Sequence, residues 1–173
     1  KEYSISCPTV IRNIAKLYVK NSIIETIIPF REKYDIRKDE IIYIYQGLLS
    51  KGRRVFQYIN VFKNLGKPYH IVFLGYDEYM KDVIKSSKNY SNIHYHNSVS
   101  ADEILLYTSL ADVGLVVLFP RCLSSSSRLP PTLFPSLASG IPFFAPNYPE
   151  IRNIAMKTKS GWLPAESATS FLS

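Results

Sequence analysis

Three cations follow the first strongly apolar run of the sequence. The run Ile41–Gly47 is β-branched and aromatic and ends at a glycine, and Lys51, Arg53 and Arg54 come shortly after it. A helical pattern begins directly afterwards, which predicts a strand that leads into a helix. Backbone N–H groups and the helix dipole favour an anion at the amino end of a helix, and the cations reinforce this preference. The segment therefore predicts a site for a phosphate-bearing ligand.

A second group of cations and hydroxyls follows the predicted strand Val113–Phe119. It contains Arg121, the serine run Ser124–Ser127 and Arg128, and a predicted helix begins near Thr132. Ligands of open α/β sheets bind beyond the carboxyl ends of the strands, where the strand order reverses. With the order 3-2-1-4-5, the first and fourth strands end side by side and the two groups share one crevice. Such a crevice suits a diphosphate.

The alternative for these cations is that they are solvated loop charges, as most Lys and Arg side chains are. No G-x-G-x-x-G follows a predicted strand and no Walker loop is present, so the sequence does not indicate a dinucleotide site. No Asp-x-Asp supports a metal-bridged phosphate. We therefore expect neither a metal nor another cofactor.

The three histidines, His70, His94 and His96, are further candidates for chemistry. His94 and His96 alternate on a predicted strand and so face the same side. No third ligand or paired carboxylate lies near them in sequence, and metal sites need more ligands than two. Structural roles are therefore favoured over metal binding or acid–base catalysis.

Alternating strand and helix patterns position these residues. The predicted strands are Ile41–Gly47, His70–Gly75, Ile93–His96, Val113–Phe119 and Ile141–Ala145. Helical patterns follow them, beginning near Gly52, Asp77, the capping box Ser100–Glu103, Pro130 and Pro149. Near-continuous apolar strands are typical of parallel sheets covered on both faces. We expect a single α/β domain, a doubly wound, Rossmann-like parallel sheet of about six strands with helices on both faces.

The first forty residues fit this pattern less well. Thr9–Ile11 is compatible with a short strand, and Lys16–Lys38 mixes charges with short apolar runs. We predict a linker or excursion over residues 1–40 and the Rossmann-like domain over residues 41–173. Because the chain begins without Met and stops in mid-pattern, we expect it to be a piece of a longer protein.

Composition narrows the class of protein and its partners. The 173 residues are 46% hydrophobic and 20% charged, which is typical of a folded domain. The net charge of +7 favours anionic partners: nucleotides, nucleic acid or an acidic membrane surface. The aromatic residues lie mostly in strands and helix stripes, so we do not expect nucleic-acid binding. Cys7 and Cys122 lie far apart, which suits a reducing compartment. We expect a cytoplasmic location, with peripheral contact at the inner face of a membrane left open.

These motifs, in this order, resemble the carboxy-terminal, nucleotide-sugar-binding domain of group 1 (family 4) glycosyltransferases with the GT-B fold. The resemblance covers most of the chain, from about Thr9 to Leu163. It is carried by Tyr45-Gln46-Gly47 with Gly52-Arg53, by Ser100–Leu105, by Tyr107–Leu115, and best by Leu129–Pro142 followed by Pro149-Glu150-Ile151.

The resemblance implies the donor-binding half of a hexosyltransferase-type enzyme of polysaccharide biosynthesis. It would move a sugar from a nucleotide-sugar to a glycan or lipid-linked acceptor, with retention of configuration and without a metal. The acceptor would bind a missing amino-terminal domain, so the isolated domain is not expected to be active. Arg53 would be the catalytic cation that stabilises the departing diphosphate. The donor-binding residues would be Gly47, Lys51, Arg53, Arg54, Val99 in the loop that packs on the base, Ser127, Arg128 and Thr132.

The sequence departs from the family where the donor ribose would bind. Pro135 and Ser127 stand in the place of the two glutamates of an E-x7-E pattern, and Leu48 or Leu49 stands in place of an arginine. A carboxylate that binds a ribose diol orients it strongly, and proline cannot replace it. An alternative is therefore a degenerate, non-catalytic GT-B-like module that acts in assembly or partner binding. A third hypothesis, half of a sugar-nucleotide epimerase, requires acid–base groups at the crevice that the sequence does not identify.

Overall fold

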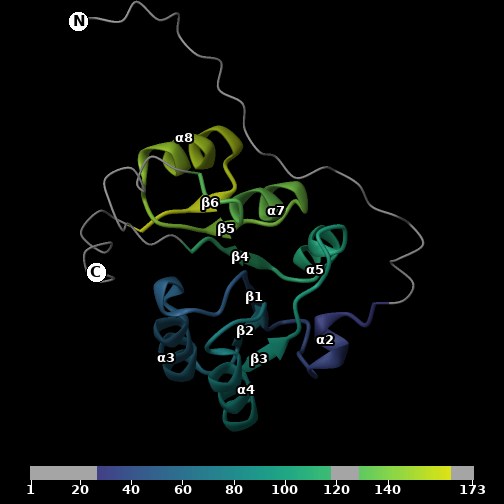
Figure 1. Cartoon of the computed structure of the whole chain (residues 1–173). Helices are drawn as coiled ribbons and strands as arrows, with labels where there is room; N and C mark the ends of the chain where they lie inside the picture. The colour runs from purple at the N-terminus through teal and green to yellow at the C-terminus, as the bar shows by residue number, and fades with distance from the viewer. Residues whose placement is uncertain (1–26, 118–128, 165–173) are drawn as a thin grey trace, which may run out of the picture.

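The computed structural model describes residues 27–117 and 129–164. The predictions that concern Thr9–Ile11, both cysteines, Arg121 and Ser124–Arg128 lie outside these residues. In chain order the elements are α2 (Phe30–Lys33), β1 (Ile41–Gln46), the 3₁₀ turn η1 (Lys51–Arg53), α3 (Val55–Leu65), β2 (Tyr69–Leu74), α4 (Met80–Asn89), β3 (Ile93–His96), α5 (Ile104–Ser109), β4 (Val113–Leu115), α7 (Leu133–Ala138), β5 (Phe143–Phe144), α8 (Pro149–Thr158) and β6 (Gly161–Trp162) (Figure 1).

The strands form one six-stranded sheet in the order β3-β2-β1-β4-β5-β6. Every neighbouring pair is parallel, which confirms the predicted α/β, Rossmann-like sheet. The chain moves outward from β1 to β3 and then returns to β4 on the other side of β1. Tyr45 of β1 is the register partner of Leu115 of β4, so these two strands end side by side. The reversal of strand order therefore lies where the sequence predicted it.

Helices cover both faces of the sheet, as Figure 1 shows. Successive strand residues point to opposite faces. Tyr45, Ile71 and Phe73 pack in a core with residues of α3 and α4 on one face. On the other face, Ile42 packs with residues of α2 and α5, and Phe143 packs with residues of α7 and α8. Burial on both faces explains why the strands are almost continuously apolar.

Four helices, α3, α4, α5 and α7, begin three or four residues later than predicted. The helix expected from Gly52 begins at Val55, because η1 and the left-handed residue Arg54 (φ 55°) come first. The helix expected at the capping box begins at Ile104. Glu103 does reach back, and its carboxylate accepts hydrogen bonds from both the N–H (3.0 Å) and the hydroxyl (2.6 Å) of Ser100. The Ser100 hydroxyl is thus used as a donor instead of capping a backbone N–H.

Part of the predicted linker packs on the sheet. Phe30 is completely buried, and Ile36 joins the same core as Ile42. The Arg31 guanidinium donates to the carbonyls of Arg37 (2.6 Å) and Glu40 (3.0 Å). It also forms an ion pair with Asp112, the residue before β4, at 2.6 Å. A four-residue helix is too short to produce a periodic pattern, which is why the sequence does not reveal it.

Truncation of Phe30 should measure how much the packing of α2 on the sheet contributes to stability. We expect Phe30→Ala to lower the free energy of unfolding by about 3–5 kcal/mol, because it empties a buried aromatic site. Ile28→Ala, two residues earlier and 57% exposed, should change it by less than about 0.5 kcal/mol. Urea denaturation measures both values. Equally small effects would show that α2 does not belong to the core.

Candidate functional site

The turn between β1 and α3 is held by the neighbouring loop. Gly47 has a φ of +125°, a conformation that side-chain-bearing residues rarely adopt, and its N–H donates to the carbonyl of Leu74 (3.1 Å). The buried Leu49 donates its N–H to Tyr76 (2.8 Å) and accepts from the N–H of Tyr79 (2.8 Å). The loop after β2 therefore fixes the turn that leads to Lys51 and Arg53.

Gly75 allows these two loops to approach each other. A Cβ atom at Gly75 would lie 1.9 Å from the carbonyl oxygen of Gly47, a distance that no side chain could adopt without displacing the backbone. At Gly47 itself a Cβ would meet no atom of the described residues within 4 Å. The backbone at the end of β1 is thus closely supported from β2.

The phenol of Tyr45 ties the start of the turn to its end. Tyr45 is buried, and its hydroxyl donates to the carbonyl of Leu48 (2.9 Å) and lies 3.4 Å from the carbonyl of Arg53. Burial raises the pKa of Tyr45, so the hydroxyl stays protonated and remains a donor at neutral pH. A buried side chain of the strand therefore sets the conformation of the cationic turn.

The three cations of the turn differ in their surroundings. Lys51 is exposed, whereas Arg53 and Arg54 are half-buried. Arg54 lies close enough to Tyr58 and Tyr148 that its charge opposes the rise in the pKa of each phenol that burial causes. Because Tyr148 follows β5, Arg54 lies at the edge of the sheet where β1, β4 and β5 end.

The other side of this edge is formed by the start of α7. A Cβ at Gly114 of β4 would lie 1.9 Å from the hydroxyl oxygen of Ser136, so α7 packs directly on the strand. Thr132 precedes the helix, and the N–H of Leu133 donates to the carbonyl of Pro130 (3.0 Å). The Thr132 hydroxyl is shielded from solvent and has no hydrogen-bond partner among the described residues. Gly140 (φ +71°) follows the helix.

The predicted site residues fall into three groups. Gly47, Lys51, Arg53 and Arg54 follow β1, and Thr132 begins the helix after the adjacent strand β4. Val99 is half-buried in the core on the face opposite α3, with Ile104 and Tyr107 among its neighbours. Ser127 and Arg128 lie outside the described residues.

Pro135, which stands in place of a family glutamate, lies buried in the first turn of α7. Proline has no backbone N–H, and its absence breaks no hydrogen bond here because the first N–H groups of a helix lack intrahelical partners. Two residues at this edge, Tyr148 and Gly75, were not among the predicted site residues. Tyr148 could have been found by its place after a strand and directly before Pro149 at the start of a helix.

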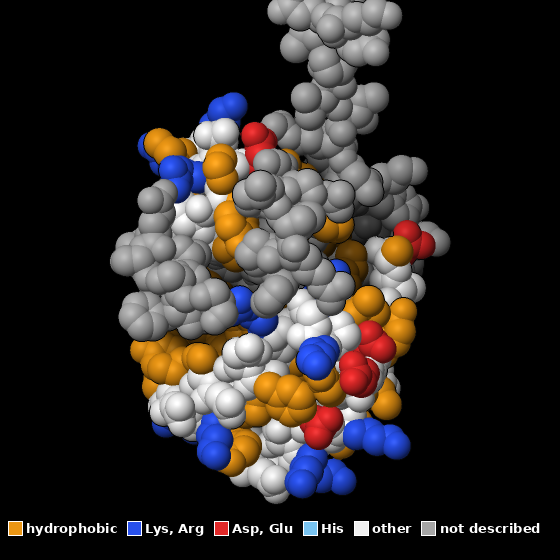
Figure 2. All heavy atoms as spheres, turned by 60° about the vertical axis from the view of Figure 1, so that its left-hand side comes forward, with side chains coloured by type: hydrophobic (Ala, Val, Ile, Leu, Met, Phe, Trp, Pro, Cys, Tyr) orange, Lys and Arg blue, Asp and Glu red, His pale blue; other side chains and the backbone are white. Residues whose placement is uncertain are grey.

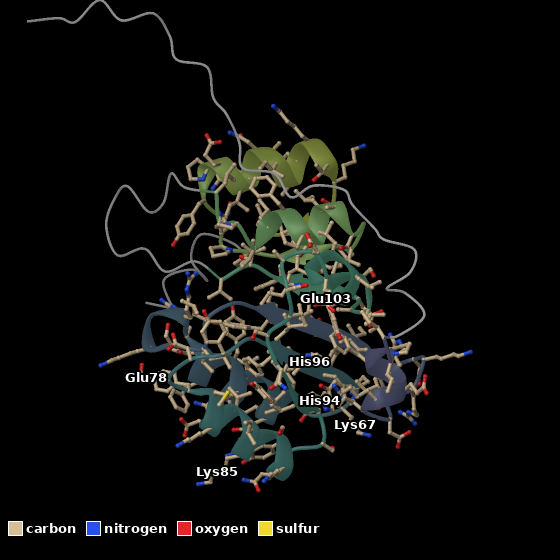
Figure 3. The ribbon with its side chains drawn as sticks, turned by 45° about the vertical axis from the view of Figure 1, so that its right-hand side comes forward. Lys67, Glu78, Lys85, His94, His96 and Glu103 are labelled. Atoms are coloured by element: carbon tan, nitrogen blue, oxygen red, sulfur yellow. The ribbon has the colours of Figure 1, made fainter. Side chains whose placement is uncertain are left out.

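The histidines lie on the face that α2 and α5 cover. His94 stacks on Tyr34, which directly follows α2, and His96 packs beside Phe30 and Tyr107, so both face the same side as predicted (Figure 3). A carboxylate that the sequence did not indicate, that of Glu40, lies 3.3 Å from Nε2 of His70. Among residues 27–117 and 129–164, no group of three or more His, Cys, Asp and Glu side chains is placed to hold a metal ion.

The surface shows no single strongly basic patch on the face drawn in Figure 2. Lys and Arg side chains are dispersed there among hydrophobic and acidic ones. In the part of the chain that the structure describes, every helix is too short or too polar to cross a bilayer.

Comparisons with known proteins identify the fold but no sequence family. No protein-family model matches the sequence, and no curated protein matches it. Among solved structures, WaaG, a glycosyltransferase involved in lipopolysaccharide biosynthesis, superposes with a TM-score of 0.56 at 16% identity. The match covers 86% of this chain but only 39% of WaaG, so the chain spans much less than the whole of that enzyme.

Two weaker matches have TM-scores below 0.5. The amino-terminal domain of a trehalose-6-phosphate phosphatase from Candida albicans matches at 0.49 and 13% identity, over 86% of this chain and 35% of that one. The carboxy-terminal CMP-Kdo binding domain of WaaA from Acinetobacter baumannii matches at 0.45 and 8% identity, over 82% and 81%. The fold, a parallel Rossmann-like sheet with its switch point between β1 and β4, is therefore one that glycosyltransferases such as WaaG use.

Removal of the Tyr45 hydroxyl should loosen the cationic turn. We expect Tyr45→Phe to lower the free energy of unfolding by about 1–2 kcal/mol, because a partly buried carbonyl loses its donor. Tyr43→Phe is the matched control: Tyr43 lies on the same face of the same strand without a hydrogen bond from its hydroxyl among the described residues, and it should cost less than about 0.5 kcal/mol. Urea denaturation compares the two. Equal costs would contradict the assigned role of Tyr45.

Proposed function

We propose that this chain binds the nucleotide-sugar donor of a glycosyltransferase. The diphosphate would lie between the turn after β1 and the start of α7. The observation that carries the proposal is the parallel pairing of β1 with β4, which brings the strand before Lys51, Arg53 and Arg54 beside the strand before Thr132. Cations and the positive end of a helix at one edge favour a polyanion over a neutral ligand. The likeness of the fold to WaaG supports the same function, although a fold alone does not establish one.

In the proposed reaction, the sugar moves to a glycan or lipid-linked acceptor with retention of configuration. The charge that develops on the departing diphosphate is stabilised by Arg53, with Lys51 and Arg54 nearby, and the reaction uses no metal ion. Val99 contributes to the site of the base. The acceptor binds elsewhere in a larger enzyme, and the two isolated cysteines favour a cytoplasmic setting. These assignments follow the resemblance described above.

Calorimetric titration with UDP, GDP, ADP and CMP tests the donor site. We expect micromolar to low-millimolar binding of at least one of them. Lys51→Ala and Arg53→Ala should each weaken it at least about tenfold, or about 1.4 kcal/mol, because a charge-assisted contact is lost. The control Lys85→Ala removes an exposed cation on α4 and should leave the affinity unchanged. Binding that neither cation variant weakens would place the ligand elsewhere.

A second candidate function is a degenerate, non-catalytic module that serves assembly or partner binding. The buried Pro135 favours it, because this position offers no carboxylate to a ribose. In this case no nucleotide should bind the wild-type chain at millimolar concentration. The same titration therefore separates the two functions.

A further inference from the structure

A chain of buried titratable groups lies away from the crevice. Glu40 precedes β1, His70 is near the start of β2 and His94 is in β3; their exposed fractions are 1%, 1% and 8%. His70 Nδ1 lies 3.0 Å from His94 Nε2, and His70 Nε2 lies 3.3 Å from a Glu40 oxygen. The crevice lies beyond the carboxyl ends of β1 and β4, whereas Glu40 precedes the amino end of β1, about 20 Å away for six residues at 3.3 Å each. The proposed donor site therefore leaves these groups without a role.

The two distances fix the proton arrangement of the pair. A bare lone pair on Nε2 of His70 would lie 3.3 Å from the negatively charged Glu40 carboxylate and be repelled by it, so this nitrogen carries the proton, although the contact is not aligned as a hydrogen bond. The Nδ1 of a neutral His70 is then an acceptor, and His94 donates to it through its Nε2–H. If both rings were charged, two N–H groups would face each other across 3.0 Å and the hydrogen bond would be lost. The pair therefore tolerates at most one additional proton.

The surroundings oppose even that proton. Burial, together with the smaller effects of the charges of His70 and Lys67, lowers the pKa of His94 to about 4. Burial also lowers the pKa of His70, although Glu40 acts in the opposite direction. A backbone hydrogen bond from Arg37 lowers the pKa of Glu40, which stays ionised.

Other charged or titratable groups surround the pair on every element packed against it. They are Arg31, Lys33 and Tyr34 from α2 and its end, Arg37, Asp39 and Glu40 from the following loop, Lys67 before β2, His96 of β3, Tyr107 of α5 and Asp112 before β4.

The pair holds α2 on the sheet. The ring of Tyr34 stacks on His94 with 4.4 Å between centroids, and its hydroxyl donates to the carbonyl of Tyr95 (2.8 Å). Figure 3 shows His94 and His96 beside α2, with Lys67 near them. α2 has four residues and no strand partner, whereas β1 is held by ladders on both sides. A positive charge on His94 is therefore expected to detach α2 from the sheet before it disturbs β1.

We propose that Glu40, His70 and His94 form an acid-sensitive latch that holds α2 against the sheet. When α2 opens, His94 regains an ordinary pKa near 6.5 and can take up a proton that the closed form refuses. The pKa of His94 is lower in the closed form than in the open form. The neutral ring therefore stabilises the closed form fully above the open-form pKa, and this stabilisation is lost as the pH falls below that value. The latch is therefore closed above about pH 6.5 and weakens between that pH and about pH 4. Glu40, whose pKa is also lowered, adds to the loss only below its ordinary value of 4.5.

Amide hydrogen exchange tests the latch. After correction for the intrinsic pH dependence of exchange, the opening constant at the N–H groups of Lys33, Tyr34 and Ile36 should rise about tenfold between pH 7.5 and 5.5. The amides of β1 should stay protected over this range. His94→Gln, which can still donate to His70 but cannot be charged, should lose most of the rise. His96→Gln removes a second imidazole that packs beside Phe30 and whose pKa burial also lowers, but it leaves the pair intact and should lose a smaller part of the rise.

Three outcomes would overturn the latch. They are a flat opening constant at α2 in the wild type, the same rise in His94→Gln, and simultaneous loss of protection in α2 and β1. If His94→Gln does not fold, ring resonances of the folded wild type decide: titration of His94 below about pH 5 supports the latch, and titration near pH 6.5 contradicts it.

Discussion

The pairing of β1 with β4 is the constraint on which the candidate site depends. In sequence, the cationic turn and the start of α7 are about eighty residues apart, and no local signal connects them. The chain first moves outward to β3 and then returns to the other side of β1, which makes the ends of two distant segments neighbours. Right-handed crossovers with helices on both faces leave few other ways to build such a sheet. Close packing then fixes the details: Gly114 brings α7 onto β4, and Gly75 brings the β2 loop onto the end of β1.

Much of this architecture could be predicted from local patterns. Strands were predicted from apolar runs that end at glycines, and helix starts from the prolines that precede α7 and begin α8. The strand order follows from the general rules for parallel sheets. Groups that depend on tertiary contacts were missed. Glu40 lies thirty residues from His70 in sequence, Tyr148 meets Arg54 only because β5 lies beyond β4, and α2 is too short to show a period. The start of α3 was displaced by the η1 turn and the left-handed Arg54, and at α5 the Ser100 hydroxyl donates to Glu103 instead of capping a backbone N–H.

The two ends of the strands have different characters. At the carboxyl ends, backbone turns, exposed or half-buried cations and a helix start lie where we propose that an anion binds. At the amino ends, a carboxylate and two neutral imidazoles are enclosed beneath α2 and are shielded from water. Charged side chains near solvent are suited to bind a ligand, whereas a buried charge must be paired or hydrogen-bonded within the fold. The same sheet thus carries the proposed ligand site at one edge and a buried group of polar side chains at the other.

We propose that the edge where β1 and β4 end forms a single site for a nucleoside diphosphate. Chemical-shift mapping in a ¹⁵N-labelled chain, titrated with UDP and GDP, tests it most directly. We expect the largest shifts on amides of two separate segments, Gly47–Val55 and Thr132–Phe134, and we expect them to saturate together with one dissociation constant. Shifts confined to one segment, or centred on the outer surfaces of α4 or α8, would contradict it.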